Sequence, residues 1–172
     1  MSPYATGTPF QLIWNDGHTD MLLEVPVAGA NVLVTKHPLH PNSGTNGWIQ
    51  KRDNGRIYLL DAAGKPTSFC LDANLPDQHE VNGVFPDGSG CLVYLNSDIP
   101  QRQTQLWQIT PRGDGSFFVQ NIGLSLSIQY GPAAGPYVLD SGGNNLQGGA
   151  AKLWRKDAGN RNQYWQLRAC AL

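Results

Sequence analysis

The amino-acid sequence predicts an all-β domain built from one structural unit used three times. Three tryptophans, Trp48, Trp107 and Trp165, recur at spacings of 59 and 58 residues. The last two lie in similar phrases, Gln-Leu-Trp-Gln-Ile at 105–109 and Gln-Tyr-Trp-Gln-Leu at 163–167, and the first lies in a degenerate copy. A large aromatic side chain that returns at a long, fixed period indicates internal repetition. The threefold repeat is therefore expected to determine the architecture of the whole domain.

Composition supports short strands rather than helices. The chain has 172 residues, which suit a single domain. Its 20 glycines and 12 prolines favour many short strands joined by turns. Apolar residues make up 40% of the chain, which argues against disorder. No window shows a sustained helical stripe with capping residues at both ends.

Each repeat divides into four short runs rich in Val, Ile, Leu and aromatic residues, bounded by turn residues. The first runs are 10–14, 56–60 and 116–120, the second runs are 21–25, 69–73 and 124–128, the third runs are 31–36, 91–96 and 152–156, and the fourth runs contain the repeated tryptophans. Twelve short strands must hide their edges, and a six-stranded barrel capped by three hairpins does so. The predicted fold is a β-trefoil over residues 1–172, with repeats at about 9–54, 55–111 and 112–172. The three tryptophans are expected in its core.

The predicted loops differ in length between the repeats. Five residues, 26–30, join the second and third runs of the first repeat, whereas 74–90 and 129–151 fill the same place in the other two. Loops of this length without structure of their own are usually functional or mobile. We therefore look for a site beside them.

Charge and terminal sequence exclude several functions. The net charge of −1 provides no basic field for nucleic acid or an anionic membrane. No apolar run approaches the roughly 18 residues of a membrane helix, and the first residues lack the regions of a signal peptide. Three cysteines cannot form a closed disulfide framework. We expect a cytoplasmic protein with reduced thiols; release by a non-classical route and a homodimer remain open alternatives.

Catalytic and metal motifs do not emerge from the sequence. His37 and His40 are three residues apart, but a proline intervenes and no third ligand is near, so a surface loop is the preferred interpretation. The sequence contains no phosphate loop, nucleophile elbow or HExxH motif. We expect neither an enzyme nor a bound cofactor or metal.

The phrase Phe-Cys-Leu-Asp at 69–72 and the Gln-x-Trp phrases at 105–107 and 163–165 resemble the ricin B-type (R-type) lectins. The resemblance covers residues 9 to 167, and the missing signal peptide and disulfides are more similar to small cytoplasmic fungal members. It implies binding of galactose- or N-acetylgalactosamine-type glycans through one or two of three repeat pockets.

In that family a carboxylate at the end of the second run accepts hydrogen bonds from two sugar hydroxyls, an aromatic of the third run stacks on the sugar, and an Asn-Gln pair precedes the tryptophan. A carboxylate suits this role because it accepts several charge-assisted hydrogen bonds. In the second repeat the resemblance implies Asp72, Tyr94 and Gln105 as contacts, with Thr104 in place of Asn. A turn cap at Asp72 and a core position for Tyr94 remain alternatives.

In the third repeat the resemblance implies Trp154, Asn162 and Gln163 as sugar contacts, although the last two could instead hold the loop before the strand. Ser127 stands at the expected carboxylate position. The substitutes that the long loop offers are Asp140, Asn144 and Asn145.

The first repeat is expected to be inactive, since the residues at its family positions are Glu24, Thr35 and Thr45. Loss of a charge-assisted bond costs ~1.5–3 kcal/mol, whereas loss of a neutral one costs ~0.5–1.5 kcal/mol. This comparison favours the second repeat for simple galactosides and the third for more complex glycans.

Other functions of the same fold stay open at this point. A trefoil can be a protease inhibitor, or a non-catalytic partner subunit of an enzyme. A disulfide between Cys70 and Cys91 is a further alternative, because Cys70 occupies the family's first half-cystine position.

Overall fold

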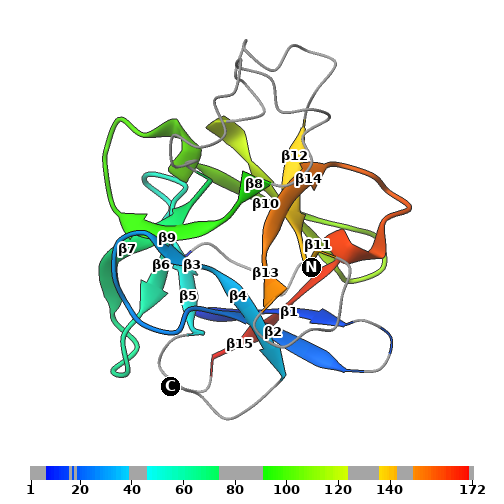
Figure 1. The fold of residues 1–172 in the computed structure, drawn as a ribbon, viewed down its shortest axis with the longest axis horizontal. Coiled ribbons are helices and arrows are strands. Elements are labelled where there is room, and N and C mark those ends of the chain that lie inside the picture. The colour runs from blue at the N-terminus through cyan, green and yellow to red at the C-terminus, as the bar shows by residue number, and fades with distance from the viewer. Residues whose placement is uncertain are drawn as a thin grey trace.

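The computed structural model describes residues 7–15, 17, 19–38, 46–73, 91–123, 136–142 and 149–170, and these are almost entirely short β-strands (Figure 1). The strands of the first repeat are β1 (Phe10–Asn15), β2 (Asp20–Glu24), β3 (Val32–Leu33), β4 (Thr35–Pro38) and β5 (Trp48–Gln50). Those of the second repeat are β6 (Ile57–Leu60), β7 (Pro66–Asp72), β8 (Cys91–Leu92), β9 (Tyr94–Ser97) and β10 (Trp107–Pro111). Those of the third repeat are β11 (Phe117–Asn121), β12 (Tyr137–Asp140), β13 (Gly149–Ala150), β14 (Lys152–Arg155) and β15 (Trp165–Ala169). The 3₁₀ turns η3 (Gln103–Gln105) and η5 (Arg161–Gln163) precede β10 and β15.

The first and fourth strands of the repeats close a six-stranded barrel. Antiparallel ladders join β1 to β15, β5 to β6 and β10 to β11. Bridges at Phe10–Trp48 and Phe117–Trp165 connect these pairs, and the Trp107 amide donates to the Gly55 carbonyl at 3.1 Å. The hairpins β2–β4, β7–β9 and β12–β14 surround one end of the barrel (Figure 1). The all-β prediction and its trefoil arrangement are confirmed.

Three buried residues form a ring of backbone hydrogen bonds where the hairpins meet. The Val34 amide donates to the Val93 carbonyl (2.9 Å), the Val93 amide to the Ala151 carbonyl (3.1 Å), and the Ala151 amide to the Val34 carbonyl (2.9 Å). Each of these residues interrupts the third strand of its repeat, because its peptide groups bond around the ring instead of along a hairpin. The described residues therefore contain fifteen strands rather than the twelve predicted.

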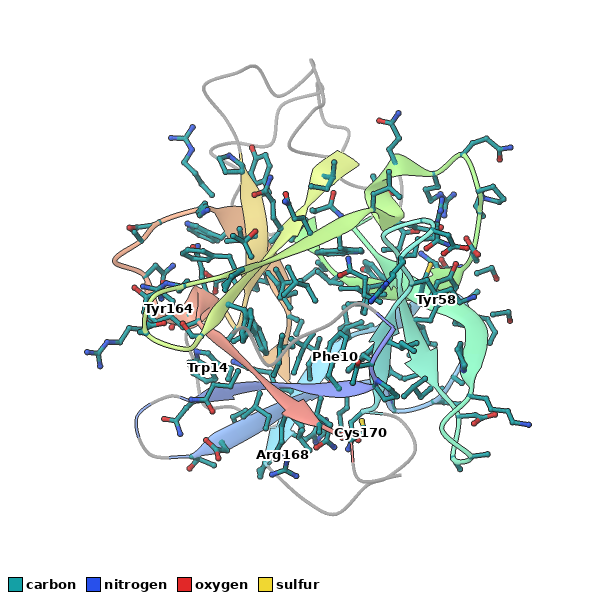
Figure 2. The ribbon with its side chains drawn as sticks, turned by 180° about the vertical axis from the view of Figure 1, so that it is seen from behind. Phe10, Trp14, Tyr58, Tyr164, Arg168 and Cys170 are labelled. Atoms are coloured by element: carbon teal, nitrogen blue, oxygen red, sulfur yellow. The ribbon has the colours of Figure 1, made fainter. Side chains whose placement is uncertain are left out.

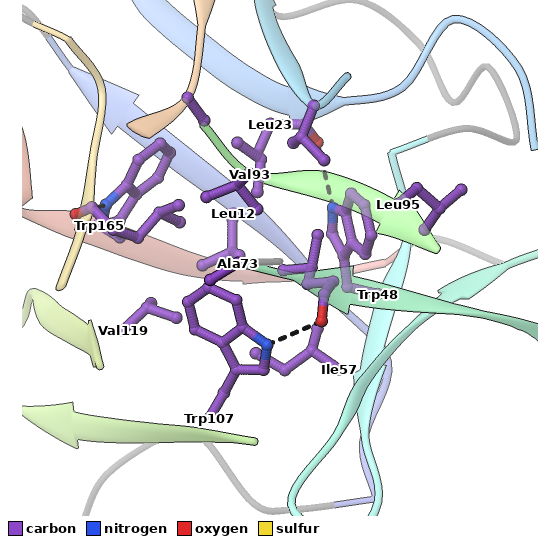
Figure 3. Close-up of a cluster of buried hydrophobic side chains, with 14 of the residues drawn as sticks. Leu12, Leu23, Trp48, Ile57, Ala73, Val93, Leu95, Trp107, Val119 and Trp165 are labelled. Atoms are coloured by element: carbon purple, nitrogen blue, oxygen red, sulfur yellow. Dashed lines mark hydrogen bonds between the residues drawn. The ribbon is translucent and has the colours of Figure 1, made fainter. Parts of the chain in front are cut away.

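The repeated tryptophans fill the core, as predicted (Figure 3). Each is at most 3% exposed. Each indole N–H donates to a leucine carbonyl in the second strand of its own repeat: Trp48 to Leu23 (3.1 Å), Trp107 to Leu71 (2.9 Å) and Trp165 to Leu139 (2.9 Å). These three bonds satisfy the only polar atom of each buried indole and give an internal alignment of the repeats.

The predicted second strand of the third repeat requires correction. Because Leu139 accepts the Trp165 indole, and β12 pairs with β14, Tyr137–Asp140 takes the place that the sequence analysis gave to 124–128. Residues 124–135 lie outside the described part of the chain. The long segment of this repeat thus comes before its second strand, and residues 141–148 join the second strand to the third.

Two further observations concern the cysteines and the helices of the described residues. Cys70 is a buried free thiol, so the structure holds no Cys70–Cys91 disulfide. Within the described residues, no helix has the length and hydropathy needed to cross a membrane.

Candidate functional site

The internal alignment places one acidic residue at the same point of every repeat. The residue after the indole-accepting leucine is Glu24 in the first repeat, Asp72 in the second and Asp140 in the third. Asp140, rather than Ser127, is therefore at the carboxylate position of the third repeat. Ser127, Asn144, Asn145 and Thr45 lie outside the described residues.

The sheet register identifies what faces these acids. The residues paired with them across each hairpin are Thr35, Tyr94 and Lys152. Two residues further along the third strands stand His37, Asn96 and Trp154. The resemblance implies that Tyr94 is the counterpart of Trp154, and the register corrects this: Tyr94 corresponds to Lys152, and Asn96 to Trp154.

The third repeat carries an open pocket of about 190 Å³ beside its acid. Its lining consists of Asp140, Gly142, Lys152, Trp154, Asn160 and Asn162. Trp154 is 39% exposed, which is unusual for an indole in a small domain and gives the pocket an apolar wall. Trp154 and Asn162, which the sequence analysis assigned to one pocket, do lie together.

Three donors hold the Asp140 carboxylate at the base of this pocket. Oδ1 accepts a hydrogen bond from the Gly142 amide (2.7 Å), and Oδ2 accepts from the side chains of Asn160 (3.1 Å) and Gln163 (3.4 Å). A carboxylate offers about four acceptor positions. Asp140 is 3% exposed, and the described residues supply only one donor, the Gly142 amide, to its Oδ1.

The turn η5 brings the amide side chains to the pocket. The Asn160 side chain accepts a hydrogen bond from the Asn162 amide (3.0 Å), and the Ser141 amide donates to the Asn162 carbonyl (2.9 Å). The Asn162 side chain makes no hydrogen bond to the part of the chain that the structure describes. Its donor and acceptor are both available to a molecule in the pocket.

Gln163 lies behind the pocket rather than in it. Its side chain is fully buried, donates to the Arg155 carbonyl (2.8 Å) and accepts from the Asp157 amide (2.9 Å), besides its bond to Asp140. Gln105 has the same arrangement in the second repeat, where it bonds Ser97, Ile99 and Asp72. Both glutamines position the carboxylate and the following loop.

The second repeat has the same acid but a filled pocket. The donors to the Asp72 carboxylate are Thr104 Oγ1 (2.7 Å), Asn96 Nδ2 (3.2 Å), Arg102 Nη1 (3.1 Å) and Gln105 Nε2 (3.1 Å). Asp72 is 0% exposed, and Tyr94 opposite it is half-buried. The protein's own side chains occupy the acceptor positions that a sugar would use.

Two further groups below this filled pocket have shifted pKa values. Burial, together with the negative charges of Asp98 and Asp72, raises the pKa of the Cys70 thiol to about 12. Burial and a hydrogen bond to Asp98 (2.6 Å) raise the pKa of the Tyr58 hydroxyl above its ordinary value. Figure 2 shows Tyr58 and Tyr164 on opposite sides of the molecule, in the second and third repeats.

Comparison with known proteins identifies the fold. No family model and no curated protein matches the chain. Among solved structures, the designed threefold-symmetric protein ThreeFoil is similar over 94% of this chain and 99% of its own, with a TM-score of 0.66 and 16% identity. The C-half of the earthworm R-type lectin, in complex with GalNAc, is similar over 95% and 99%, with a TM-score of 0.58 and 14% identity. The fold is a β-trefoil.

A third similar structure shows this trefoil as part of a longer chain. A non-toxic homologue of type II RIPs from bitter gourd, in complex with α-methyl-D-galactoside, has a TM-score of 0.59 and 16% identity. The match covers 93% of the present chain and 48% of that one.

The first repeat of the trefoil completes the comparison of its three acids. Glu24 Oε1 lies 3.6 Å from His37 Nε2, and Thr35 stands opposite Glu24. Among the described residues, no group of three or more His, Cys, Asp or Glu is arranged to hold a metal ion. Of the three acid positions, the one in the third repeat combines a carboxylate, an exposed indole and an amide side chain that has no hydrogen-bond partner among the described residues.

Proposed function

We propose that this trefoil binds glycans, of the galactose or N-acetylgalactosamine type, through the third-repeat pocket. The observation that carries the proposal is the 39% exposed indole of Trp154 in the same small pocket as the Asp140 carboxylate. Sugars present a hydroxylated edge and an apolar C–H face. This pocket offers a hydrogen-bond acceptor, the Asp140 carboxylate, for the hydroxylated edge and a flat ring, the Trp154 indole, for the C–H face.

In this proposal, each residue that lines the pocket makes a different contact with the sugar. Asp140 accepts a hydroxyl proton through the remaining acceptor position of Oδ1, and a charge-assisted bond of this kind is stronger than a neutral one. The Asn162 amide donates to, and accepts from, neighbouring hydroxyls. Trp154 covers the C–H face, and its rigid side chain loses little rotamer entropy on binding. Specific orientation comes from the polar groups, and contact area comes from the ring.

The comparisons support the proposal without deciding it. The earthworm lectin and the bitter gourd protein have the same fold and are described in complex with GalNAc and α-methyl-D-galactoside. The proposal differs from the sequence analysis in one respect: the third repeat, and not the second, is the expected site for simple galactosides, because the Asp72 acceptors are already occupied.

A binding experiment with a matched control tests the site. A glycan array identifies a ligand, and calorimetry then compares the wild type with Trp154→Ala and with Val27→Ala, which truncates another exposed apolar side chain, in the first repeat. Trp154→Ala should weaken binding at least about tenfold, equivalent to about 1.4 kcal/mol, and Val27→Ala should not change it. Unchanged binding in Trp154→Ala would show that the pocket is elsewhere.

One alternative function has an observation in its favour. A non-catalytic partner subunit needs no open sugar pockets, and here the second acid position is filled and the first lies against His37. If no glycan binds at high protein concentration, the lectin proposal is lost, and the partner-subunit and protease-inhibitor alternatives replace it.

A further inference from the structure

The third-repeat pocket contains a lysine at a register position where the other two repeats have uncharged residues. Lys152 lines the pocket and is the cross-strand partner of Asp140. The corresponding positions of the other repeats carry Thr35 and Tyr94, which have no positive charge. Of the three residues that pair with the acids across the hairpins, Lys152 alone carries a positive charge.

Local packing directs this lysine toward the pocket rather than away from it. A Cβ placed on Gly142 would lie 3.7 Å from Lys152 Cε and 3.9 Å from Cδ, so the lysine stem runs beside the glycine at the end of β12. Gly142 has a φ of +78°, a conformation that glycine adopts without strain. Lys152 as a whole is half-buried, which is typical of a lysine that packs its carbons along the protein surface.

The charge of Lys152 has no counter-ion among the residues that the structure describes. Asp140 is the nearest candidate by register, but its oxygens bond Gly142, Asn160 and Gln163 instead. The described residues provide no other carboxylate at ion-pairing distance from Lys152. A ligand with a negative group next to the ring-binding position would supply the missing partner.

The segment that surrounds Lys152 in the sequence also carries an excess of positive charge, which favours an anionic ligand. Residues 149–170 contain five of the twelve basic residues of the chain and one of its thirteen acidic residues. The whole chain has a net charge of −1, so this excess is local. A local field of one sign raises the concentration and the association rate of oppositely charged ligands.

We infer that the third-repeat pocket prefers saccharides that carry an oxyanion, as a sulfate ester or a carboxylate, and that Lys152 pairs with that group. The inference rests on the proposed glycan-binding function and names its ligand class. The sugar ring lies on Trp154 and bonds Asp140, while the oxyanion lies toward the Lys152 ammonium. Sulfate and carboxylate share the charge that matters here and differ in shape, so the experiment treats them separately.

Calorimetry with four probes tests the inference: galactose, galactose 3-sulfate, galactose 6-sulfate and galacturonic acid. We expect at least one acidic probe to bind about three- to tenfold more tightly than galactose, with the advantage decreasing between 50 and 500 mM NaCl as ions screen the pair. The sulfates and the uronic acid show which oxyanion the pocket accepts.

Substitutions identify the residue responsible. Lys152→Gln should remove the acidic preference while galactose still binds, and Lys152→Arg should retain it. Lys65→Gln removes the same charge from an exposed position in the second repeat and should change nothing. Equal binding of neutral and acidic probes, or a preference that survives Lys152→Gln, overturns the inference and leaves glycan binding intact. If none of the probes and no arrayed glycan binds, both proposals fail together.

Discussion

The Thr104 hydroxyl donates a hydrogen bond of 2.7 Å to Oδ1 of Asp72, a residue 32 positions earlier in the chain. Thr104 occupies the position at which R-type lectins have an asparagine. Three further side chains donate hydrogen bonds to Oδ2 of Asp72. The carboxylate therefore holds segments of the protein together and has no acceptor position open to a sugar. The consequences of this difference between the repeats are measurable.

Asp72→Ala should destabilise the protein rather than only remove a ligand contact. It leaves buried donors without acceptors and Arg102 without its partner, a loss that we expect to cost about 3 kcal/mol or more. Urea unfolding measures the change, and Asp53→Ala, at an exposed position, is the control. A folded Asp72→Ala variant of wild-type stability that has lost galactoside binding would instead restore the sugar-contact role.

The core and pocket tryptophans should respond in opposite ways to truncation. Trp107→Ala and Trp165→Ala should each lower the free energy of unfolding by ~3–5 kcal/mol, because each removes a large buried ring. Trp154→Ala should change it by less than about 0.5 kcal/mol, as is usual for exposed sites. Chemical denaturation of the three variants checks this contrast. Near-wild-type stability of both core variants would contradict the internal alignment.

The backbone ring should be among the most protected parts of the molecule. The amides of Val34, Val93 and Ala151 are fully buried, and each bonds the carbonyl of another repeat, so exposing one of them requires that a whole hairpin separate from the other two. In hydrogen exchange measured by NMR, their opening free energies should equal the global free energy of unfolding. Exchange at the rate of the exposed turn at 52–54 would show that the ring opens independently.

Stability should decline in alkaline solution as a result of Cys70. Its pKa is about 12 in the folded protein, against an ordinary value of 9.0, so between these values the native state keeps a proton that the unfolded state has lost. Stability is thus unaffected by this group below pH 9 and falls as the pH rises from 9 to 12. Tyr58, whose pKa is also raised, adds to the decline.

Thermal unfolding of the wild type and of Cys70→Ala from pH 7 to 11 checks this prediction. The variant should show a shallower loss of stability above pH 9, because the titrating thiol is gone. Parallel curves would mean that the thiol does not titrate differently in the two states.

The fold could be predicted from the sequence because its strongest signal is periodic. The spacing of Trp48, Trp107 and Trp165 reflects a contact that each repeat makes within itself, between the indole and a leucine carbonyl. Local strand patterns then sufficed for most of the elements. The interruption of the third strands was not predictable, since the ring depends on three residues from different repeats.

The candidate site was predicted less completely, for a related reason. The alternating run at 124–128 has a clear strand pattern, and pattern alone cannot tell which of two runs pairs with β14. A better signal was present: Tyr-Val-Leu-Asp at 137–140 matches Phe-Cys-Leu-Asp at 69–72. Lys152 and Asn160 were missed because their role depends on cross-strand register and on a turn. The occupation of the Asp72 acceptor positions could not be predicted, because the side chains that donate to this carboxylate come from separate segments of the chain.

The ring of Val34, Val93 and Ala151 also bears on how the chain reaches this state. Its members are 59 and 58 residues apart, so no two of them meet until a long intervening segment has been ordered. Non-local contacts of this kind make folding slow and place the closing step late. During synthesis, the first two repeats emerge before Ala151 exists to complete the ring. A chain synthesised only as far as the second repeat therefore holds two hairpins without their common partner, and the ring closes only after the third repeat has been made.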